Sequence, residues 1–477
     1  MPFFITPVQV SGVSIEPSRC RGSHRTCTTN NAFLQTAWVA GRAPRVTFSF
    51  ERTNHRYSPK SGFSFTLATS AQTPSPSFSP RPPSPTISIN NDTPGNTRPT
   101  RAVVDLAALE RNFLSIQNAV GPSTKVLTVL KANAYGHGIV PVARYLENHL
   151  GPHYFGVAIP EEGIELRNAG IESPILVLGS IARNQVVPAL MHDLTLTAHS
   201  IDKLTWIDNA AKSLEATATV HLEFDTGMER VGVHWYNADT LIRHSLSCEN
   251  CFIEGVYSHF AHSDAADLAS AREQLSRFKE VLDVYDKLQI PTPPIRHLAN
   301  SGAILQLPDS YFDMVRAGIL LYGVYPSHEC QRSIAVEPCL SLQSKVVYFK
   351  VVEEGMAVSY GHTWTAPKQT RVVTVPIGYG DGYPRALSNV GQVLIRGRRY
   401  PVIGRICMDQ LMVNIDWDEA YNGDDVVLLG SQNNTPDKLT DPPITVDELA
   451  TLLGTIPYEV LTNLAPRVPR VYVHTSP

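Results

Sequence analysis

Short runs of apolar and β-branched residues alternate with helical stretches from Arg101 to about residue 337, and this alternation constrains the fold more than any other feature. Each run is followed by a longer segment with apolar residues at helical spacing. Repeated β–α units of this length predict a (β/α)8 TIM barrel, an α/β fold in which each parallel strand is followed by a helix. A doubly wound open sheet is the main alternative, and periodicity alone does not separate the two.

Nine runs are predicted as strands, one more than a barrel of eight needs, and we expect the extra strand to be the first, before the barrel begins. The predicted strands are Val103–Asp105, Val126–Leu130, Tyr154–Ala158, Ile175–Leu178, Leu194–Ala198, Val220–Phe224, Ile253–Ser258, Ile295–Leu298 and Met314–Leu320, and the clearest predicted helices are Ala107–Val120, Val140–His149 and Ala265–Leu288.

After about Pro338 the pattern changes to short β-rich runs separated by Gly and Pro, which predicts a separate, mainly β domain. Its predicted strands are Val346–Val352, Arg371–Pro376, Gln392–Ile395, Pro401–Ile403, Val426–Leu429 and Val471–Val473, with a helix at Val446–Leu453. The predicted domains are therefore an N-terminal extension (1–100), a barrel (101–337) and a mainly β domain (338–477).

The first hundred residues differ in composition from the rest of the chain. They contain ten Lys and Arg, three acidic residues and 13 of the 36 prolines, so their formal charge is +7 within a total of −4. A Ser- and Arg-rich, acid-poor segment of this kind is expected to be disordered and resembles an organelle transit peptide. We expect a plastid or mitochondrial location if the segment is a transit peptide, and a cytoplasmic one if it is an uncleaved tail.

Charge and cysteine content argue against several functions. A net charge of −4 gives no electrostatic reason to expect nucleic acid or an anionic membrane as a partner. The sequence contains no run of about 18 apolar residues, the length that a helix needs to span a bilayer. Seven cysteines are too few for a disulfide scaffold in 477 residues. Cys248 and Cys251 form one CxxC pair without the second ligand pair that a zinc site needs, so we expect no metal and reduced, incidental thiols.

Residues suited to catalysis follow the predicted strands. Lys131 comes directly after Val126–Leu130 and opens the segment Lys131-Ala-Asn-Ala-Tyr-Gly-His-Gly138. A lysine at the carboxyl end of a buried strand loses solvation, which lowers its pKa and makes it a Schiff-base nucleophile. A solvated rim lysine is the ordinary alternative. Other strands lead into Asp225–Arg230, His259 and Asn300–Gly302, and the last predicted strand carries Arg316 and Gly318. A phosphate site after the last two strands recurs in this barrel.

The motifs resemble those of the alanine racemase family. The resemblance covers residues from about 101 to 477 in order. It rests on the segments Val129–Gly138, Asp225–Arg230, Ser258–Phe260, Ala299–Ser301, Val315–Ile319, Ser359–Trp364, Gly378–Gly382, Arg405–Gln410 and Arg467–Arg470.

This resemblance implies a fold-type-III pyridoxal 5'-phosphate enzyme that works as a homodimer on a small amino acid and interconverts L-alanine and D-alanine. Lys131 is implied to hold the cofactor as an aldimine and to act as one base. Tyr360, from the β domain of the partner subunit, is implied to be the base on the opposite face. A racemase needs one base on each face because the planar carbanion is reprotonated from either side.

Further roles follow from the same resemblance. Arg316 is implied to face the pyridine nitrogen of the cofactor, with His297 supporting it, and His259 and Arg316 are implied to orient Tyr360 and lower its pKa. The implied phosphate contacts are Tyr135, Ser301, Gly318 and Ile319, with Tyr379 at the rim. The implied substrate contacts are Arg230 and Met408, and the charged residues of the substrate entrance are Asp264, Arg385 and Arg405.

Two positions depart from the family pattern. Glu223 stands where many members have a carbamylated lysine that pairs with the arginine, and since a carboxylate is already an anion we expect no modified lysine. Pro466 stands before Arg467, where some relatives place a phosphate-binding tyrosine, which removes one expected phosphate contact and one wall of the entrance.

Three other functions are compatible with parts of the pattern. A serine or broad-specificity racemase would use the same residues, because an apolar pocket discriminates by only about 1–3 kcal/mol per methylene. Fold-type-III decarboxylases lack the tyrosine base that Tyr360 supplies. A non-catalytic pyridoxal-phosphate carrier would end after the barrel, whereas this chain continues beyond Pro338.

Overall fold

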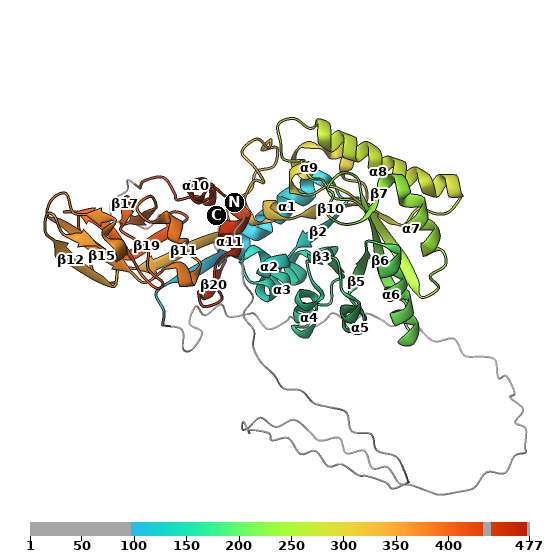
Figure 1. Cartoon of the computed structure of the whole chain (residues 1–477), viewed down its shortest axis with the longest axis horizontal. Helices are drawn as coiled ribbons and strands as arrows, with labels where there is room; N and C mark the ends of the chain where they lie inside the picture. The colour runs from blue at the N-terminus through green and yellow to red at the C-terminus, as the bar shows by residue number, and fades with distance from the viewer. Residues whose placement is uncertain (1–96, 433–439, 475–477) are drawn as a thin grey trace, which may run out of the picture. The chain divides into compact units, whose positions relative to one another are not determined.

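A computed structural model describes residues 97–432 and 440–474, and the predictions for residues 1–96 therefore lie outside the described residues. The predicted fold class is confirmed: a closed barrel of eight parallel strands is followed by a mainly β domain (Figure 1). Within the part of the chain that the structure describes, no helix combines the length and the apolar character needed to cross a bilayer.

The barrel closes because each strand pairs in parallel with two neighbours, and the last pairings are β10 with β2 and β5 with β6. Its strands are β2 (Lys125–Val129), β3 (Tyr154–Val157), β4 (Ile175–Val177), β5 (Thr195–Ala198), β6 (Ala218–Asp225), β8 (Cys251–Tyr257), β9 (Ile295–His297) and β10 (Met314–Ala317). The helices that surround it are α1 (Leu106–Val120), α3 (Ile139–Leu150), α4 (Pro160–Asn168), α5 (Arg183–Met191), α6 (Ile201–Ser213), α7 (Ala238–Ser245) and α8 (Ala269–Leu288).

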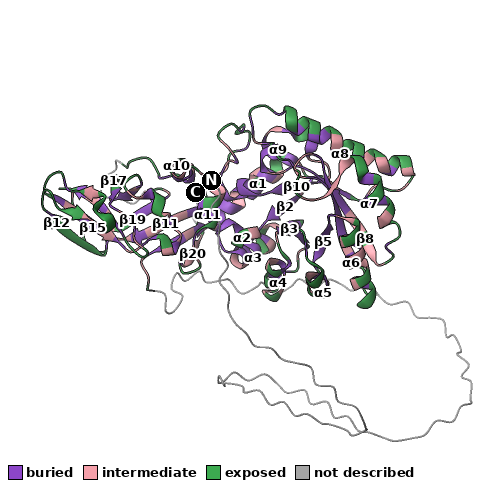
Figure 2. Cartoon of the chain, in the orientation of Figure 1, coloured by how far each residue is buried: buried purple, intermediate pink, exposed green. Residues whose placement is uncertain are grey.

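Burial explains why these sequences form barrel strands. Every residue of β3, β4, β5 and β10 is buried, as expected for parallel strands that are covered on both faces (Figure 2). The carboxyl ends of these strands open toward one end of the barrel, where catalytic residues gather in this fold.

The extra first strand lies before the barrel, as we expected, but it pairs outside the barrel domain to which we had assigned it. Strand β1 (Arg101–Asp105) pairs antiparallel with β11 (Leu340–Lys345) and parallel with β20 (Arg470–Val473), so it belongs to the sheet of the second domain. Only Ala102 and Val104 of β1 are buried, and this alternation fits a sheet that is packed on one face rather than a barrel interior. The sheet of the β domain therefore includes residues from both ends of the described chain.

The second domain is built on a nine-stranded sheet in the order β12-β15-β18-β17-β16-β19-β11-β1-β20. The strands not yet given are β12 (Tyr348–Val352), β15 (Thr370–Val375), β16 (Gln392–Ile395), β17 (Arg398–Ile403), β18 (Leu411–Asp416) and β19 (Asp425–Leu429). Helix α10 (Val446–Leu453) is confirmed at its predicted bounds, whereas β11, β18 and helix α11 (Pro457–Thr462) were not predicted.

The C-terminal segment packs on the loop that follows Lys131. A Cβ atom on Gly136 would lie 2.2 Å from the carbonyl oxygen of Leu461 in α11, so only glycine allows this approach. Arg470 Nε donates to the carbonyl of Gly136 at 3.1 Å, and the Tyr472 hydroxyl donates to the carbonyl of His137 at 3.1 Å. These contacts bring α11 to the carboxyl end of the barrel.

Candidate active site

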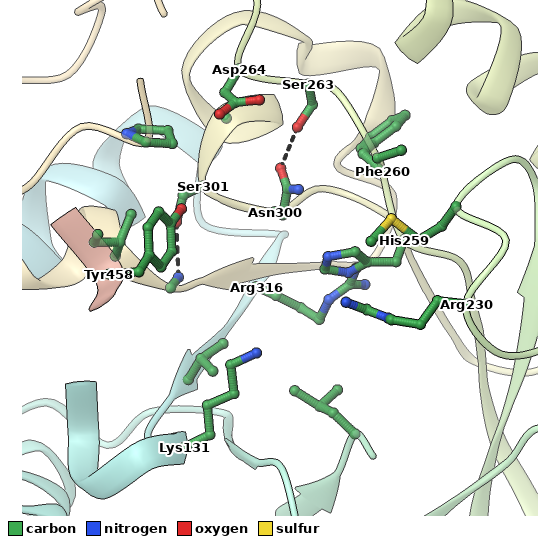
Figure 3. Close-up of a pocket in the computed structure, with 18 of the residues that line it drawn as sticks. Lys131, Arg230, His259, Phe260, Ser263, Asp264, Asn300, Ser301, Arg316 and Tyr458 are labelled. Atoms are coloured by element: carbon green, nitrogen blue, oxygen red, sulfur yellow. Dashed lines mark hydrogen bonds between the residues drawn. The ribbon is translucent and has the colours of Figure 1, made fainter. Parts of the chain in front are cut away.

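Lys131 is the first residue after Leu130 at the carboxyl end of β2, and its side chain lines a cavity of about 440 Å³ (Figure 3). Residues predicted from five different loops line the same cavity: Tyr135, Arg230, His259, Asp264, Ser301, Arg316, Gly318 and Ile319. The fold thus brings together side chains that are up to 188 positions apart, between Lys131 and Ile319.

The amine of Lys131 has a pKa lowered from its usual 10.5. Burial is the main cause, and the positive charges of Arg230 and Arg316 add to it, while the carboxylate of Glu162 acts in the opposite direction. A lowered pKa increases the fraction of neutral amine, which is the nucleophilic form.

The chain turns in a left-handed conformation directly after Lys131. Ala132, Asn133, Ala134 and Tyr135 have φ between +51° and +57°, a region that costs about 1–2 kcal/mol for each residue with a Cβ atom. The Asn133 side chain accepts a hydrogen bond from the Ile139 amide at 2.8 Å, and Glu162 accepts one from the Ala132 amide at 2.7 Å. The turn directs the Tyr135 ring back into the cavity.

A cradle of small residues and hydroxyl groups lies at one end of the cavity. Ser301 Oγ accepts a hydrogen bond from the Gly318 amide at 3.0 Å, and a Cβ on Gly318 would lie 3.0 Å from the Tyr135 hydroxyl. Burial raises the pKa of Tyr135, so its phenol stays protonated and can donate. Neutral donors and close backbone are what a phosphate group requires.

Arg316 lies at the centre of the site, and its terminal nitrogens are occupied. Nη1 donates to His297 Nδ1 at 2.9 Å, and Nη2 contacts His259 Nδ1 at 3.1 Å and the Ser258 carbonyl at 2.9 Å. Among the described residues no acceptor is found for its Nε–H, although Arg316 lines the cavity. A buried guanidinium with one donor left over fits the ring nitrogen of pyridoxal phosphate, which needs one hydrogen-bond donor.

His259 is held neutral between two cations. Burial lowers the pKa of His259 well below 6.5, and the charges of Arg316 and Arg230 add to the effect. Its Nδ1 therefore accepts from Arg316, and the proton of the neutral ring belongs on Nε2.

Glu223 is buried in the wall of the cavity, but it does not pair with Arg230 in the described residues. Its carboxylate accepts a hydrogen bond from the Tyr257 hydroxyl at 2.9 Å and lies 2.8 Å from His199 Nε2. The His199 ring is close enough for an ion pair but is not aligned for a hydrogen bond.

Three predicted residues lie outside this cavity within one chain. Tyr360, Met408 and Tyr379 are all in the β domain, and their exposed fractions are 71 %, 53 % and 42 %. Two backbone hydrogen bonds join the loops of Tyr379 and Met408: the Tyr379 amide donates to the Cys407 carbonyl, and the Gly380 amide donates to the Met408 carbonyl. Arg385 and Arg405 are in the same domain, away from the cavity lining.

Sequence reasoning missed Tyr458, whose side chain also lines the cavity (Figure 3). Its ring lies 6.0 Å from that of Tyr135. Pro466 is not among the residues that line the cavity, whereas Tyr458 is. The only local signal was Pro457, which is favoured at the first position of a helix and says nothing about chemistry.

The described cysteines are free thiols. Burial raises the pKa of Cys248, and it raises that of Cys251 to about 12, so neither is a reactive thiolate at neutral pH. No group of three or more potential metal ligands occurs in residues 97–432 and 440–474.

Comparison with known proteins identifies the family. The chain matches the model of the alanine racemase N-terminal domain over residues 104–326 and that of the C-terminal domain over residues 339–472. It is 44 % identical over 378 residues to an alanine racemase of Carboxydothermus hydrogenoformans, which covers 79 % of this chain and 100 % of the relative. The chain belongs to the alanine racemase family.

Solved structures of alanine racemases agree with this assignment. One from Clostridium difficile 630 has a TM-score of 0.74 and 38 % identity, and the match covers 80 % of this chain and 97 % of that one. An alanine racemase from Bartonella henselae, described with covalently bound pyridoxal phosphate, has a TM-score of 0.69 and 29 % identity over 78 % of this chain and 99 % of that one. Membership confirms the family resemblance and, with it, the enzyme class, a racemase that depends on pyridoxal phosphate.

Proposed function

We propose that this chain interconverts L-alanine and D-alanine by proton transfer between two bases, Lys131 and Tyr360 of a second copy of the chain. The observation that carries the proposal is the convergence of a lysine of lowered pKa, an arginine with an unoccupied Nε–H and a cradle of neutral donors in one cavity. Bound pyridoxal phosphate supplies the electron sink that stabilises negative charge on the substrate α-carbon.

The residues of the cavity then have distinct tasks. Tyr135, Ser301 and the amides of Gly318 and Ile319 bind the phosphate, and Tyr458 forms the facing wall. Arg316 donates to the ring nitrogen and, because a guanidinium does not give up its proton, leaves that nitrogen unprotonated. Arg230 approaches the substrate carboxylate, and its charge also favours the neutral amine of Lys131.

Lys131 takes or returns the α-proton on one face of the substrate. The opposite face needs a second base. The tyrosines that line the cavity of a single chain, Tyr135, Tyr257 and Tyr458, have pKa values raised by burial and stay protonated, so none of them is a ready base. Tyr360 meets this need if it enters from a partner, with His259 as its hydrogen-bonding neighbour and the Met408 amide holding the substrate carboxylate. A phenol at its usual pKa of about 10 is a weak base, and we propose that His259 and Arg316 orient Tyr360 for the proton transfer.

A homodimer is supported by the surface around Tyr360. Strand β12 has four consecutive exposed residues, among them Tyr348, Phe349 and Val351 with exposed fractions between 45 % and 57 %. Met356 and Tyr360 extend the same apolar surface beside a groove of about 650 Å³. Exposed apolar surface of this kind on a soluble domain favours burial against another chain.

Purified full-length protein tests the proposal when D-alanine is measured after incubation with L-alanine and pyridoxal phosphate. We expect racemisation in both directions, and its loss in Lys131→Ala. Serine is the second substrate to assay, because the wall formed by Tyr458 and Ile456 sets the room for the side chain. Cofactor binding without turnover of any amino acid would instead support the carrier function.

We also propose that the N-terminal extension directs the protein to a plastid or mitochondrion. The support is its composition, with a formal charge of +7, and the start of the family match at residue 104. A fluorescent fusion of residues 1–100 should enter one of these organelles, whereas a fusion that starts at Arg98 should not. Arg98 is retained in the second fusion because it pairs with Asp381 of the β domain at 2.7 Å.

A further inference from the structure

A line of polar side chains crosses the barrel interior behind the cavity. It begins at Arg316, whose Nη1 donates to His297 Nδ1 at 2.9 Å. His297 Nε2 lies 2.9 Å from His221 Nδ1, and His221 Nε2 lies 3.1 Å from the carboxylate of Glu254. Both imidazoles are fully buried, and Glu254 is the central residue of β8, three residues before the carboxyl end of that strand.

The charge states of these groups fix which atoms carry protons. Burial lowers the pKa of His221 and of His297, so each ring is neutral, with one N–H and one lone pair. Burial alone would raise the pKa of Glu254, but hydrogen bonds from His221 and Tyr154 outweigh it and lower the pKa. Glu254 is therefore a carboxylate that can only accept hydrogen bonds.

Only one direction of hydrogen bonding satisfies every member. Arg316 has no lone pair to offer, so His297 Nδ1 must accept and His297 Nε2 must carry the proton. His221 Nδ1 then accepts from His297, which leaves the His221 proton on Nε2, where Glu254 accepts it. The carboxylate and the guanidinium thus impose the same tautomer on the two rings from opposite ends.

Without Glu254, no acceptor fixes the His221 proton on Nε2 at the end of the line farthest from Arg316. His221 could then carry its proton on Nδ1 and donate to His297 Nε2, which would move the His297 proton to Nδ1. Two N–H groups would face each other across the 2.9 Å between His297 and Arg316. A buried donor opposed by another donor is costly, so Arg316 would shift.

We propose that Glu254 is a positioning residue of the racemase, which holds Arg316 in place through the tautomers of His221 and His297; this rests on the proposed function. With Nη1 committed to His297, the guanidinium keeps a fixed orientation in which Nε–H remains for the cofactor ring. Glu254 itself touches neither cofactor nor substrate, since it is not in the cavity lining.

Steady-state kinetics of three holoenzyme variants test this role. Glu254→Leu removes the acceptor, and we expect kcat to fall about tenfold or more while KM for L-alanine stays within about twofold, because the change acts on the reacting ring rather than on substrate binding. Glu254→Gln keeps an acceptor oxygen and should restore kcat to within about threefold of the natural protein.

The matched control is Asp313→Asn. Asp313 accepts from the Arg296 side chain at 2.7 Å and from the Arg296 amide at 2.8 Å. Arg296 neighbours His297 in β9, but Asp313 lies outside the line to Arg316. It should lower thermal stability and leave kcat unchanged. If Glu254→Leu loses no more kcat than this control, or if Glu254→Gln loses as much as Glu254→Leu, the proposal is wrong.

A measurement on the unmodified holoenzyme keeps the proposal testable if the leucine variant does not fold. Nitrogen-15 spectra of histidine-labelled protein should show His221 and His297 with the proton on Nε2 only. A proton on Nδ1 of either ring overturns the proposal. If the unmodified protein does not racemise alanine at all, the proposed function is wrong instead, so the two failures are distinguishable.

Discussion

The ring of Tyr458 lies 6.0 Å from the ring of Tyr135, although the two residues are 323 positions apart in the chain. Tyr135 comes from the left-handed turn after Lys131, and Tyr458 comes from α11 at the C-terminal end of the β domain. The cavity is therefore not a property of the barrel alone. The C-terminal segment completes one wall of it within the same chain.

The first prediction concerns this wall. We expect the Tyr458 hydroxyl, which lines the cavity beside Tyr135, to donate to the cofactor phosphate. Tyr458→Phe should therefore weaken pyridoxal phosphate binding about tenfold or more, since a hydrogen bond to a charged group contributes about 1.5–3 kcal/mol. Tyr325→Phe is the control, because it also removes a hydroxyl, one that donates to the Ile334 carbonyl at 3.0 Å outside the cavity. Cofactor titration followed by absorbance measures both, and equal affinities in the two variants would contradict the assignment of Tyr458.

The second prediction concerns the close approach of α11 to the loop after Lys131. Gly136 and Gly170 both have φ of +84°, but a Cβ on Gly170 meets nothing within 4 Å, whereas one on Gly136 lies 2.2 Å from the Leu461 carbonyl. Gly170→Ala should cost about 1 kcal/mol of unfolding free energy from backbone conformation alone. Gly136→Ala should cost about 1–3 kcal/mol more from the clash. Denaturant unfolding compares the two, and equal costs would mean that the contact is absent.

The third prediction follows from the lowered pKa of Lys131. The neutral amine reacts with the aldehyde of pyridoxal phosphate, so capture of the cofactor by cofactor-free protein should rise with pH and reach half its maximum below 10.5. Arg230→Met removes a charge that lowers this pKa, and the midpoint should move to higher pH. Glu229→Gln, at an exposed neighbour, should leave it in place. A midpoint at or above 10.5 in the natural protein would contradict the assignment.

Much of the fold and of the chemistry was predictable from local patterns. Most barrel strands are short, largely apolar runs. Lys131, His259 and Ser301 follow such runs and Arg316 lies near the end of the last one, so their shared cavity follows from parallel strands whose carboxyl ends meet. These are features that a sequence carries within a few neighbouring residues.

What the sequence did not predict depends on long-range packing. Strand β1 reads like any other apolar run, and only its pairing with β11 and β20 assigns it to the second domain. Helix α11 is six residues long, too short for a helical period to be seen, and Tyr458 therefore gave no signal. The same holds for Glu254, whose role comes from a partner in β6 rather than from its neighbours.

The most direct test of the central claim, a site shared between two copies of the chain, is a mixing experiment. Lys131→Ala and Tyr360→Phe should each abolish most racemisation, as each homodimer lacks one base at both of its sites. After the two variants are unfolded and refolded together in equal amounts, half of the dimers should be mixed, each with one intact site, so about a quarter of the natural activity should return. Recovery to that level supports the account, whereas a mixture as inactive as its two components would contradict it.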